Sequence, residues 1–545
     1  MKKRIMALLL MFVMTVGLLA GCTPATPTET TAGNEETKAP AATEGTTEGA
    51  TEATEVSAYP LVNEPITIKV AVVDRDMTNP KRLVYERMAE LTGINVELIS
   101  IDKDQFNVYL ASNDWPDVFM EGLTASNVYE YGVLGQMLVN YQDYLDIMPN
   151  LSKAMEAYPD MYKISVQEDG GIYALPRVEY TNGLTMSRLH YSSDFLEKNN
   201  LEEPSTLDEF YDLLVKCRDL NNGAAPLTVN LKKGHEYAAP VIFPAFGEYG
   251  ILGYCVGSDG VVVDSYTTDQ YREYLKYMNK LYEENLLHEE YNTLDNNAIL
   301  GLIQEGTGIF WAECATSVTA EMFSDGELHI GTLSPLVMNE GDTPACIGVK
   351  PVKDARSFAI NANSPYVEEI CKWIDIAFAT EEVAEGTGLY GRAFTYGPEG
   401  ETFFLNSDGT YTATFPDGTE GITTQWRYDN VVIGQYGLCD MRDYLSALTG
   451  SVGIRTMGYK EKVAPYCTMP VYPSVVHTAE EQEILDQYST EQESYKQSMC
   501  HKFIMGVEDI DDDAVWQNYL DMMKSYHTDE LVAVKQAAYD RYVAN

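Results

Sequence analysis

The sequence predicts an α/β fold built on a mostly parallel β-sheet. Residues 66–73 alternate between apolar and polar side chains and then become fully apolar, as a strand entering a sheet does, and residues 94–99 and 116–120 form two further apolar runs. A helical pattern fills the interval between the first two runs, from Pro80 to Leu91, and Gly93 ends it. This strand–helix–strand repetition indicates parallel strands joined by crossover helices.

Acidic side chains follow two of the three predicted strands. Asp76 comes just after the first strand, and Glu121 directly follows the third. Ligands of parallel sheets bind beyond the carboxyl ends of the strands. We therefore expect Asp76 and Glu121 to face a ligand, with a solvated surface role as the alternative for both.

Three later segments have the spacing of amphipathic helices. Residues 206–209 form a Thr-Leu-Asp-Glu capping box, which starts a helical pattern of apolar side chains over 210–217. Residues 271–282 and 368–378 show a second and a third apolar face. The acidic run 508–513 invites a metal hypothesis, but acids that cap the N-terminus of a helix explain it better.

The charge and motifs of the chain exclude several classes of function. Its 545 residues carry 83 acidic and 37 basic side chains, for a net charge of −46. Binding to nucleic acid or to anionic lipid requires clustered Lys and Arg, so we expect neither. The seven histidines lack the spacing of a zinc site, and the chain has no G-x-S-x-G or Walker-A motif. We expect no cofactor, no metal and no enzymatic activity.

The N-terminus has the layout of a secretory signal. Three basic residues at 2–4 precede an apolar run over 5–19, and the Leu-Ala-Gly-Cys junction at 19–22 resembles the lipobox of bacterial lipoproteins. We expect residues 1–22 to form a signal peptide that ends at Cys22, the residue that carries the lipid in lipoproteins. The alternatives are an ordinary secretory signal and a transmembrane anchor, although the apolar run falls short of the ~20 residues that a membrane span needs.

The rest of the chain divides into a tether and a folded body. Residues 23–58 are rich in Thr, Glu, Ala, Gly and Pro without an aromatic side chain, so we expect a disordered acidic tether. Residues 59–545 have the length of two or more domains. Eight cysteines are scattered along this body without a C-x-x-C motif. An exported protein can form disulfides, but the spacing specifies no pairing.

Five short strings of the body carry a family resemblance. They are Leu91–Val96 (LTGINV), Leu110–Val118 (LASNDWPDV), Asp169–Pro176 (DGGIYALP), Glu203–Phe210 (EPSTLDEF) and Ala537–Tyr542 (AAYDRY). They resemble strings of the family 1 extracellular solute-binding proteins of ABC importers, in particular the large saccharide-type lipoproteins of Firmicutes. They follow the order found in that family, and the resemblance spans most of residues 60–545.

The resemblance implies a periplasmic-binding-protein-like fold: two α/β lobes joined by a hinge, with an interlobe ligand cleft that closes by lobe motion. We expect an N-lobe formed mainly by residues 60–175 plus a later segment near 350–395. The C-lobe is expected mainly over residues 180–345 plus the C-terminal helices. The implied function is capture of a sugar or oligosaccharide and its delivery to permease subunits with their ATPase.

The resemblance also implies where the protein works. A lipid at Cys22 would anchor a monomer to the cell membrane on the extracellular side, and this lipid would be its contact with the membrane. Three alternatives stay open. They are a binding protein for peptides or another non-sugar solute, a surface polysaccharide hydrolase, and a sensor that reports ligand occupancy to a membrane kinase.

A saccharide presents flat C–H faces and hydroxyl groups, so its binding sites combine aromatic rings with charged or amide groups. Trp311 and Glu313 end an apolar stretch, at the family's strand-to-cleft position, and Trp426 and Arg427 fall within one predicted loop. Residues 177–180 follow the DGGIYALP string, where the chain is expected to pass between lobes. Core packing is the alternative for the Trp rings, and a solvated surface for the arginines. The expected ligand-binding residues are Asp76, Glu121, Arg177, Tyr180, Trp311, Glu313, Trp426 and Arg427.

Some members of this family carry a calcium loop after the helix that follows the TLDEF string. The corresponding residues 218–226 of this chain include Asp219, but they lack further acids at alternating positions and a closing Glu. We therefore expect no calcium at this segment.

Overall fold

A computed structural model describes residues 59–544, apart from residues 78–80, 113, 181–188, 232–238, 313–317, 349, 384–385, 408–410, 414–423, 435 and 441–449. The chain divides into two compact units, Met1–Val56 and Ser57–Asn545, and every described residue belongs to the second. The predicted signal peptide, Cys22 and the predicted tether lie outside the described residues.

The first sheet contains the three strands predicted near the start of the body. β1 (Ile66–Val73) lies between β2 (Ile94–Ile101) and β3 (Val118–Phe119) and runs parallel to both, which confirms the predicted parallel sheet. β13 (Ala359–Ile360) returns from much later in the chain and pairs antiparallel with β3. The carboxyl ends of β1 and β3 therefore meet at one edge of the sheet.

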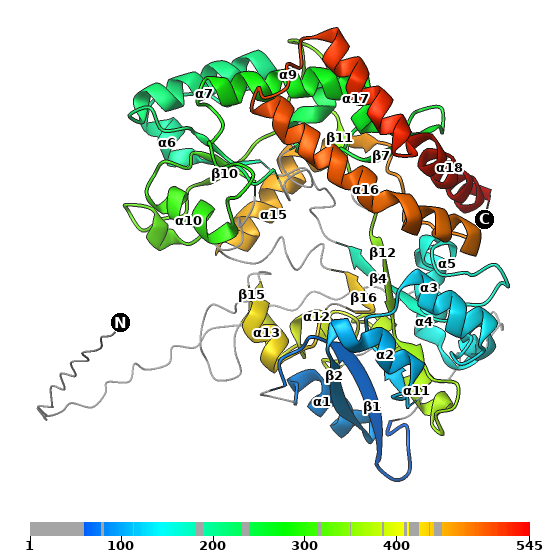
Figure 1. Cartoon of the computed structure of the whole chain (residues 1–545). Helices are drawn as coiled ribbons and strands as arrows, with labels where there is room; N and C mark the ends of the chain where they lie inside the picture. Colours follow the sequence, from blue (N-terminus) through cyan, green and yellow to red (C-terminus); the bar gives the residue numbers. More distant parts are fainter. Residues whose placement is uncertain are drawn as a thin grey trace, which may run out of the picture. The chain divides into compact units, whose positions relative to one another are not determined.

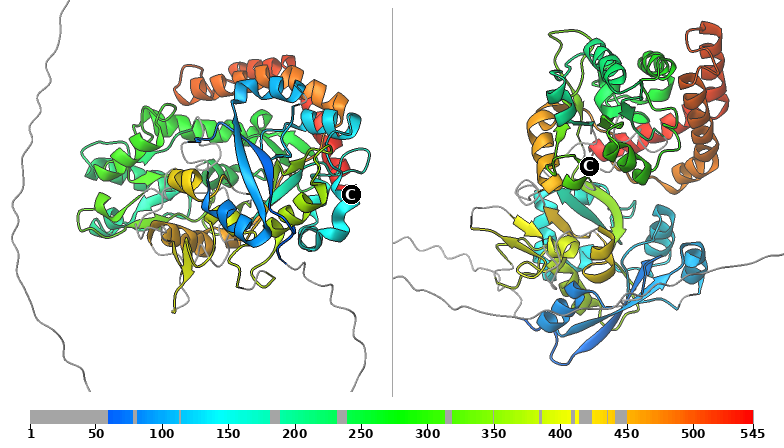
Figure 2. Two further views of the ribbon diagram at one scale, coloured as in Figure 1. Left: turned by 90° about the horizontal axis from the view of Figure 1, so that it is seen from below. Right: turned by 90° about the vertical axis from the view of Figure 1, so that its left-hand side faces the viewer.

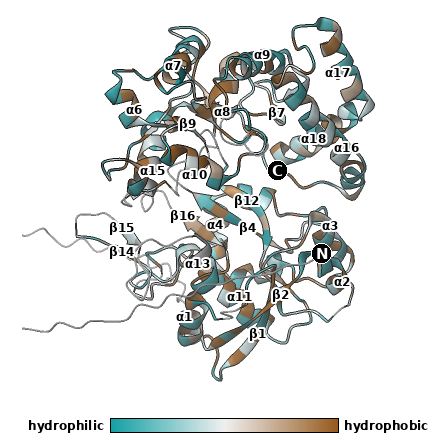
Figure 3. Ribbon diagram, turned by 60° about the vertical axis from the view of Figure 1, so that its left-hand side comes forward, coloured by the Kyte–Doolittle hydropathy of each residue, from teal (hydrophilic) through white to brown (hydrophobic). Residues whose placement is uncertain are grey.

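Helices cover this sheet and complete a first hydrophobic core. α1 (Leu83–Thr92) ends at Gly93, whose φ of +79° favours glycine. α11 (Val367–Asp375) buries Trp373, and this ring stacks on Tyr85 with 6.0 Å between the ring centroids. Hydrophobic residues gather along the strands and the inner faces of the helices (Figure 3). Further elements of this part are α2 (Phe106–Ala111), α3 (Ala125–Val128), η2 (Tyr129–Leu134), η3 (Tyr141–Ile147), α4 (Pro149–Ala157), α5 (Asp160–Lys163), η8 (Ile376–Phe378), α12 (Ala393–Tyr396), β14 (Phe403–Leu405), β15 (Tyr411–Ala413) and α13 (Thr424–Asn430).

A second sheet belongs to a separate hydrophobic core. β9 (Phe310–Trp311) lies between β5 (His190–Ser192) and β6 (Leu227–Thr228), and β10 (Ile330–Thr332) pairs with the other edge of β5. The two cores draw on different parts of the chain. Residues of the first core come from 68–178 and 352–438 together with Tyr542, and those of the second from 189–336 and 499–523.

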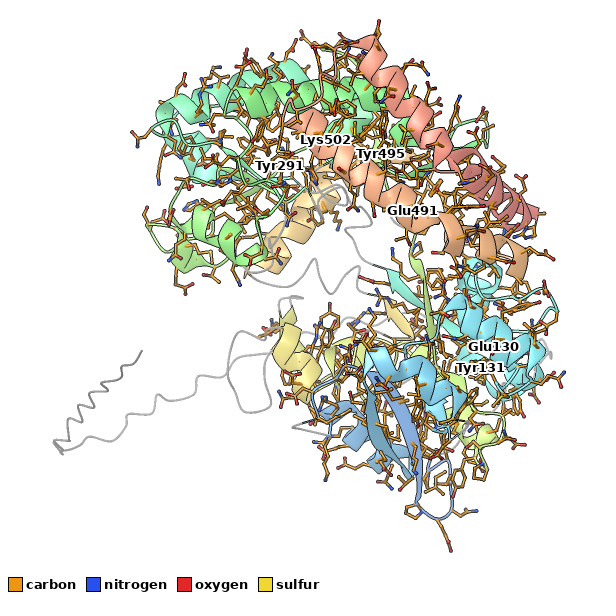
Figure 4. All side chains as sticks on the ribbon, in the orientation of Figure 1. Glu130, Tyr131, Tyr291, Glu491, Tyr495 and Lys502 are labelled. Atoms are coloured by element: carbon orange, nitrogen blue, oxygen red, sulfur yellow. The ribbon has the colours of Figure 1, made fainter. Side chains whose placement is uncertain are left out.

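Long helices surround the second sheet. α7 (Leu207–Leu220) starts with the predicted capping box, in which Thr206 and Glu209 each accept a hydrogen bond from the other's backbone N–H. α16 (Ala479–Ile504) carries Tyr495, which is labelled in Figure 4. The ring of Tyr495 lies almost parallel to that of Tyr519, with 5.9 Å between the ring centroids. Together with α17 (Asp513–Ser525) and α18 (Thr528–Ala544), α16 forms one group of packed helices (Figures 1 and 2). Other elements here are α6 (Ser193–Lys198), α8 (Ala239–Ile242), β7 (Tyr254–Val256), β8 (Val262–Asp264), α9 (Asp269–Glu283), α10 (Asn296–Gln304) and α15 (Gly450–Lys462).

Two small sheets lie where the chain passes from one core to the other. β4 (Leu175–Tyr180) lies between β12 (Val352–Ser357), which is antiparallel to it, and β16 (Leu438–Asp440), which is parallel. The chain leaves the first core along β4 and returns along β12 (Figure 1). β11 (Cys346–Ile347), just before β12, pairs parallel with β17 (Cys467–Met469).

Three predicted elements differ from the structure in extent or type. The first helix begins at Leu83 rather than Pro80, because the preceding Arg82 has an extended backbone. The third strand is limited to Val118–Phe119, since the proline at position 116 has no N–H to donate to a neighbouring strand. The predicted loop at 426–429 is wrong: it lies within helix α13, and no glycine or proline interrupts this stretch.

Candidate ligand-binding surface

Arg75 and Glu121 meet at the carboxyl ends of β1 and β3. The guanidinium donates to both carboxylate oxygens, from Nε at 2.9 Å and from Nη2 at 2.8 Å. Tyr436 donates its hydroxyl to the same carboxylate at 2.7 Å, and the backbone N–H of Val73 donates at 3.0 Å. An ionised carboxylate offers about four lone-pair sites, and these four donors occupy them. Glu121 therefore holds Arg75 in position and has no free oxygen for a ligand.

The charges in this cluster depend on one another. Burial alone would lower the pKa of Arg75, but the Glu121 carboxylate outweighs burial and raises that pKa, so the guanidinium stays charged. Burial and the adjacent Glu121 charge both raise the pKa of Tyr436, so its hydroxyl remains a hydrogen-bond donor. Arg75, with 31% of its side chain exposed, is thus a fixed cation at this sheet edge.

Arg82 joins the end of the first strand to helix α13. Arg82 is only 2% exposed, and it donates from Nη2 to the carbonyl of Asp76 and from Nε to the carbonyl of Tyr428, both at 2.8 Å. Burial lowers the pKa of Arg82, an effect that the nearby Asp429 carboxylate opposes. The Asp76 side chain itself is exposed to solvent. Arg82 thereby links two segments that are 346 residues apart in the sequence.

Arg427 lies against two tyrosine rings. Its guanidinium carbon is 4.5 Å from the ring centroid of Tyr396 and 5.4 Å from that of Tyr428. Arg75 approaches the Tyr428 ring as well, at 5.8 Å. These distances fall within the range of cation–π attraction. Arg75, Arg82, Tyr396, Arg427 and Tyr428 form one contiguous region, which we call the arginine–tyrosine surface.

The crossing strand β4 adds two charges beside this surface. Arg177 donates from Nη2 to the Glu179 carboxylate at 3.0 Å, and both side chains are partly exposed. Glu179 is the register partner of Cys439 on β16. Burial first, and then the Glu179 charge, raise the pKa of the Cys439 thiol to about 12, whereas the Arg427 charge opposes this rise. Through its pairing with β16, β4 places Glu179 beside Cys439, whose thiol is also close enough to Arg427 for that charge to affect its pKa.

Three arginine N–H groups of this region are buried without a hydrogen-bond partner among the described residues. They are Arg82 Nη1, Arg177 Nε and Arg427 Nε. A buried donor left unpaired costs about 1–3 kcal/mol, and native proteins keep few of them. These three N–H groups are shielded from solvent in this conformation, so the partly exposed guanidinium of Arg75, 5.8 Å from the ring centroid of Tyr428, is the donor that a ligand rich in hydroxyl groups can reach.

Trp311 belongs to the core rather than to an exposed surface. Its side chain is fully buried, since apolar side chains such as Ile299 and Ile303 of α10 cover its face of the sheet. The ring centroid lies 6.3 Å from that of His190, its partner on β5, and the ring packs in a cluster with Ile299 and Val318. The indole N–H has no hydrogen-bond partner among the described residues. In this conformation the Trp311 ring is therefore not a platform for a ligand.

The other predicted site residues differ in how much of each the structure describes. Glu313 lies outside the described residues. Tyr180 ends β4 and Trp426 lies in α13, and the described part of the structure includes their backbone but not their side chains. The residues that come together on or beside the arginine–tyrosine surface are Asp76, Glu121, Arg177 and Arg427.

Several residues of the surface were not predicted from the sequence. Arg75 lies between two aspartates at the end of the first strand. Its position beyond the carboxyl end of that strand indicated ligand binding as much as the position of Asp76 did. Arg82 and Tyr396 lie at no predicted strand end and in no motif that indicates ligand binding. The partners of Arg82 on α13 lie hundreds of residues away, and only the fold brings them into contact.

Metal ligands are not clustered in the part of the chain that the structure describes, where no group of three or more His, Cys, Asp or Glu side chains could hold an ion. At the segment predicted to lack calcium, Asp219 Oδ1 accepts hydrogen bonds from Arg218 Nε at 3.0 Å and Nη2 at 2.9 Å. That oxygen is thereby engaged by a cation of the protein itself. Among the described helices, none has both the length and the apolar character needed to cross a membrane.

Curated proteins of related sequence are substrate-binding proteins of ABC transporters and lipoproteins. The chain is 24% identical over 494 residues to the fructooligosaccharide ABC transporter substrate-binding protein FusA of Streptococcus pneumoniae, across 85% of this chain and 88% of FusA. It is 22% identical over 245 residues to the polygalacturonan/rhamnogalacturonan-binding protein YtcQ of Bacillus subtilis, across 42% of this chain and 46% of YtcQ. No family model matches the chain.

Solved structures share the arrangement of the elements. A human-milk-oligosaccharide (HMO) binding solute-binding protein from Bifidobacterium longum infantis superposes with a TM-score of 0.70 at 18% identity, covering 88% of this chain and 99% of that one. The chain has the two-lobed solute-binding protein fold. FusA in complex with kestose superposes with a TM-score of 0.68 at 21% identity, covering 88% of this chain and all of that one. The fold predicted from the five sequence strings is confirmed.

Proposed function

We propose that this protein is the substrate-binding component of an ABC importer and that it captures a sugar or oligosaccharide between its lobes. The observation that carries the proposal is the partly exposed guanidinium of Arg75, which Glu121 holds in place beside the ring of Tyr428. The names of the relatives FusA and YtcQ, which state saccharide ligands, support the same ligand class.

The two hydrophobic cores suggest how the lobes divide the chain. The N-lobe would comprise residues 60–175 and the later segment near 350–395, extended to Leu438 because the first core continues to that residue. The C-lobe would comprise residues 180–345 with the C-terminal helices. Rotation about the crossing strands β4 and β12 would then bring the C-lobe over the arginine–tyrosine surface.

Binding in this proposal involves no covalent chemistry. The faces of Tyr396 and Tyr428 would pack on the C–H faces of a sugar, and the partly exposed guanidinium of Arg75 would donate to its hydroxyl oxygens. The bidentate pair with Glu121 keeps Arg75 in one orientation before the ligand arrives. Less side-chain entropy is lost when the donors are already held in place.

We further propose that the protein is a monomeric lipoprotein on the extracellular side of the cell membrane. Residues 1–22 would be the signal peptide, Cys22 the lipidated residue and 23–58 the tether that gives the lobes reach towards the permease subunits. The lipobox-like junction and the related lipoprotein LipO of Bacillus subtilis, 22% identical over 248 residues, support this part.

A ligand screen tests the proposed function. The Cys22→Ala chain would be heated with a broad panel of oligosaccharides, with peptides and with lipids, and the unfolding midpoint recorded for each. A ligand at 100 times its Kd stabilises a protein by about 2.7 kcal/mol, so a saccharide that binds should raise the midpoint measurably. Chromatography of the recovered saccharide should show that it is intact.

Two results would contradict the proposal. Stabilisation by peptides or lipids with none by any saccharide would make the protein a binding protein of another class. Saccharide recovered as shorter products would make it a surface hydrolase.

A further inference from the structure

Cys346 and Cys467 lie opposite each other on two neighbouring strands. Each is the first residue of its strand, and the parallel pairing of β11 with β17 brings the two residues into register. Their Sγ atoms are 3.5 Å apart. Neighbouring strands are spaced ~4.7–4.9 Å apart, a separation within the Cα–Cα range of ~4.4–6.8 Å that a disulfide spans. The side chains therefore leave the backbone on the same face at a bridgeable distance.

The surroundings of this pair suit formation of a bond. Cys346 is buried against Tyr459 and Val463, whereas Cys467 is only half-buried at the edge of that cluster. The carbonyl oxygen of Val463 lies 3.8 Å from Cys346 Sγ and 3.6 Å from Cys467 Sγ, so both thiols are directed towards the same carbonyl group. An oxidant can reach Cys467, and Cys346 is then in place to attack it.

Other described thiols are in different surroundings. Burial raises the pKa of each of these thiols far above the physiological range, which keeps them protonated and unreactive. The thiols whose pKa is raised to about 12 are those of Cys217, Cys255, Cys371 and Cys439.

We propose that Cys346 and Cys467 form a disulfide in the exported protein. The register and the Sγ–Sγ distance of the two cysteines do not depend on the proposed function. Only the oxidising surroundings outside the cell rest on it. With a small-molecule disulfide such as oxidised glutathione as oxidant, the Cys467 thiolate attacks one glutathione sulfur and releases a glutathione thiolate. The Cys346 thiolate then attacks Cys467 Sγ, forms the bond and releases the second glutathione. Two protein thiols are oxidised and one disulfide reagent is reduced to two thiols.

The position of this disulfide gives it a structural role. It would join residues 121 positions apart, and closing so long a loop restricts the unfolded chain strongly. The chain runs from β11 into the crossing strand β12, and from β17 through residues 470–478 into α16. The bond would therefore join the start of the connection from β11 to β12 with the start of the connection from β17 to α16. It would leave the strands β4 and β12 themselves unlinked.

Peptide mapping of the full chain tests the proposal. The protein would be exported by a Gram-positive host, treated with N-ethylmaleimide at lysis, digested without reductant and analysed by mass spectrometry. We expect a peptide pair containing Cys346 and Cys467, two hydrogen atoms lighter than the sum of the free peptides, which separates on reduction. Full alkylation of both cysteines, even after incubation with oxidised glutathione, would overturn the proposal.

Thermal unfolding gives a second readout. Reductant should lower the unfolding midpoint of the wild-type chain by about 3–8 °C and should leave that of Cys467→Ser unchanged. Cys371→Ala, at a buried cysteine outside the pair, should keep the response to reductant. If Cys467→Ser does not fold, the peptide map of the wild-type chain still decides. A linked peptide in a chain that binds no saccharide would refute the proposed function and support the disulfide. Saccharide binding by a chain whose two cysteines are fully alkylated would refute the disulfide and support the proposed function.

Discussion

Arg75 and Glu121 illustrate how a single predicted side chain can have a different role from the one expected. Glu121 was expected to face a ligand, yet its oxygens accept from Arg75, from Tyr436 and from the chain itself. The cation that Glu121 holds is the more exposed of the two side chains, at 31% against 20%. At the scale of the residue, the carboxylate at the strand end holds the neighbouring cation and is not itself available to a ligand.

The first prediction concerns this pair. Glu121→Gln removes the negative charge and directs an amide NH2 group at the guanidinium, so Arg75 loses its fixed orientation. We expect affinity for the saccharide found in the screen to fall about 10- to 100-fold, the range of a charge-assisted hydrogen bond, when measured by calorimetry. Arg87 and Glu401 form a matched bidentate pair at 2.6 and 2.7 Å, so Glu401→Gln is the control. Equal losses in both variants would refute a specific role for Glu121.

The second prediction concerns the ring of Tyr428, which two arginines approach. Tyr428→Ala removes an aromatic face and should weaken saccharide binding by about 5- to 50-fold, in line with ~1–2 kcal/mol for such a contact. Tyr428→Phe keeps the face and should bind within about threefold of the wild type. Tyr162→Ala, at an exposed tyrosine of α5, is the control for loss of a ring. Unchanged affinity in Tyr428→Ala would exclude this ring from the site.

At the scale of elements, the C-terminal helix shows what its AAYDRY string does. Arg541 pairs with Glu481 at the start of α16, and Tyr542 donates its hydroxyl to Asp160 of α5 at 2.6 Å. Lys163 of α5 also lies 5.2 Å from the Tyr542 ring centroid. The last turn of α18 therefore attaches the C-terminal helices to the first core, of which Tyr542 is a member.

The third prediction tests this attachment. Tyr542→Ala removes a buried ring, and we expect the free energy of unfolding to fall by about 2–4 kcal/mol in urea titrations. Tyr542→Phe loses only the hydrogen bond to Asp160 and should cost about 1 kcal/mol. Val543→Ala, at the neighbouring side chain that is 58% exposed, should have little effect. Unaltered stability in Tyr542→Ala would mean that α18 is held by other contacts.

The fourth prediction uses His477, just before α16. Burial, reinforced by the Lys535 charge and opposed by Glu481, lowers the pKa of His477 to about 4 from 6.5. The unfolded chain therefore binds a proton more readily between these values, so the contribution of His477 to stability is present above pH 6.5 and is lost as pH falls towards 4. His477→Gln should reduce the loss of stability between pH 7 and pH 5 by about 1–2 kcal/mol in urea titrations. His288→Gln is the control, and the same pH profile in wild type and His477→Gln would contradict the prediction.

On the scale of the whole molecule, the chain joins segments with different tasks. The fold of residues 59–544 provides two cores and crossing strands between them. In the proposed function the N-terminal segments would hold that body at the membrane, a role inferred from Cys22 and from the composition of residues 23–58. Binding and attachment should therefore be separable.

The fifth prediction tests this separation. Cys22→Ala should leave the Kd for the saccharide unchanged, because the arginine–tyrosine surface lies within the body, and it should reduce uptake as the protein leaves the cell surface. Small-angle scattering of the same variant should show a smaller radius of gyration with ligand, as lobe closure requires. Loss of affinity in Cys22→Ala, or uptake equal to wild type, would contradict the proposed division of tasks.

Local patterns in the sequence correctly predicted much of the first sheet, the capping box of α7 and the apolar faces of α9 and α11. These features depend on neighbours within a few residues, so periodicity and capping chemistry specify them. The ordered family strings predicted the two-lobed fold, which the superposed structures confirm.

Only the tertiary structure decided which side chains meet. Arg82 reaches α13 across 346 residues, Trp311 is buried because apolar side chains of later segments cover it, and Cys346 faces Cys467 through a strand pairing that no spacing indicates. Such contacts form when distant segments pack together, and their energies appear in no local pattern. The sequence by itself determined the fold class and the secondary structure near its start. The geometry of the candidate site came from packing, because a hydrogen bond or a cation–π contact depends on distances that the linear order of residues does not contain.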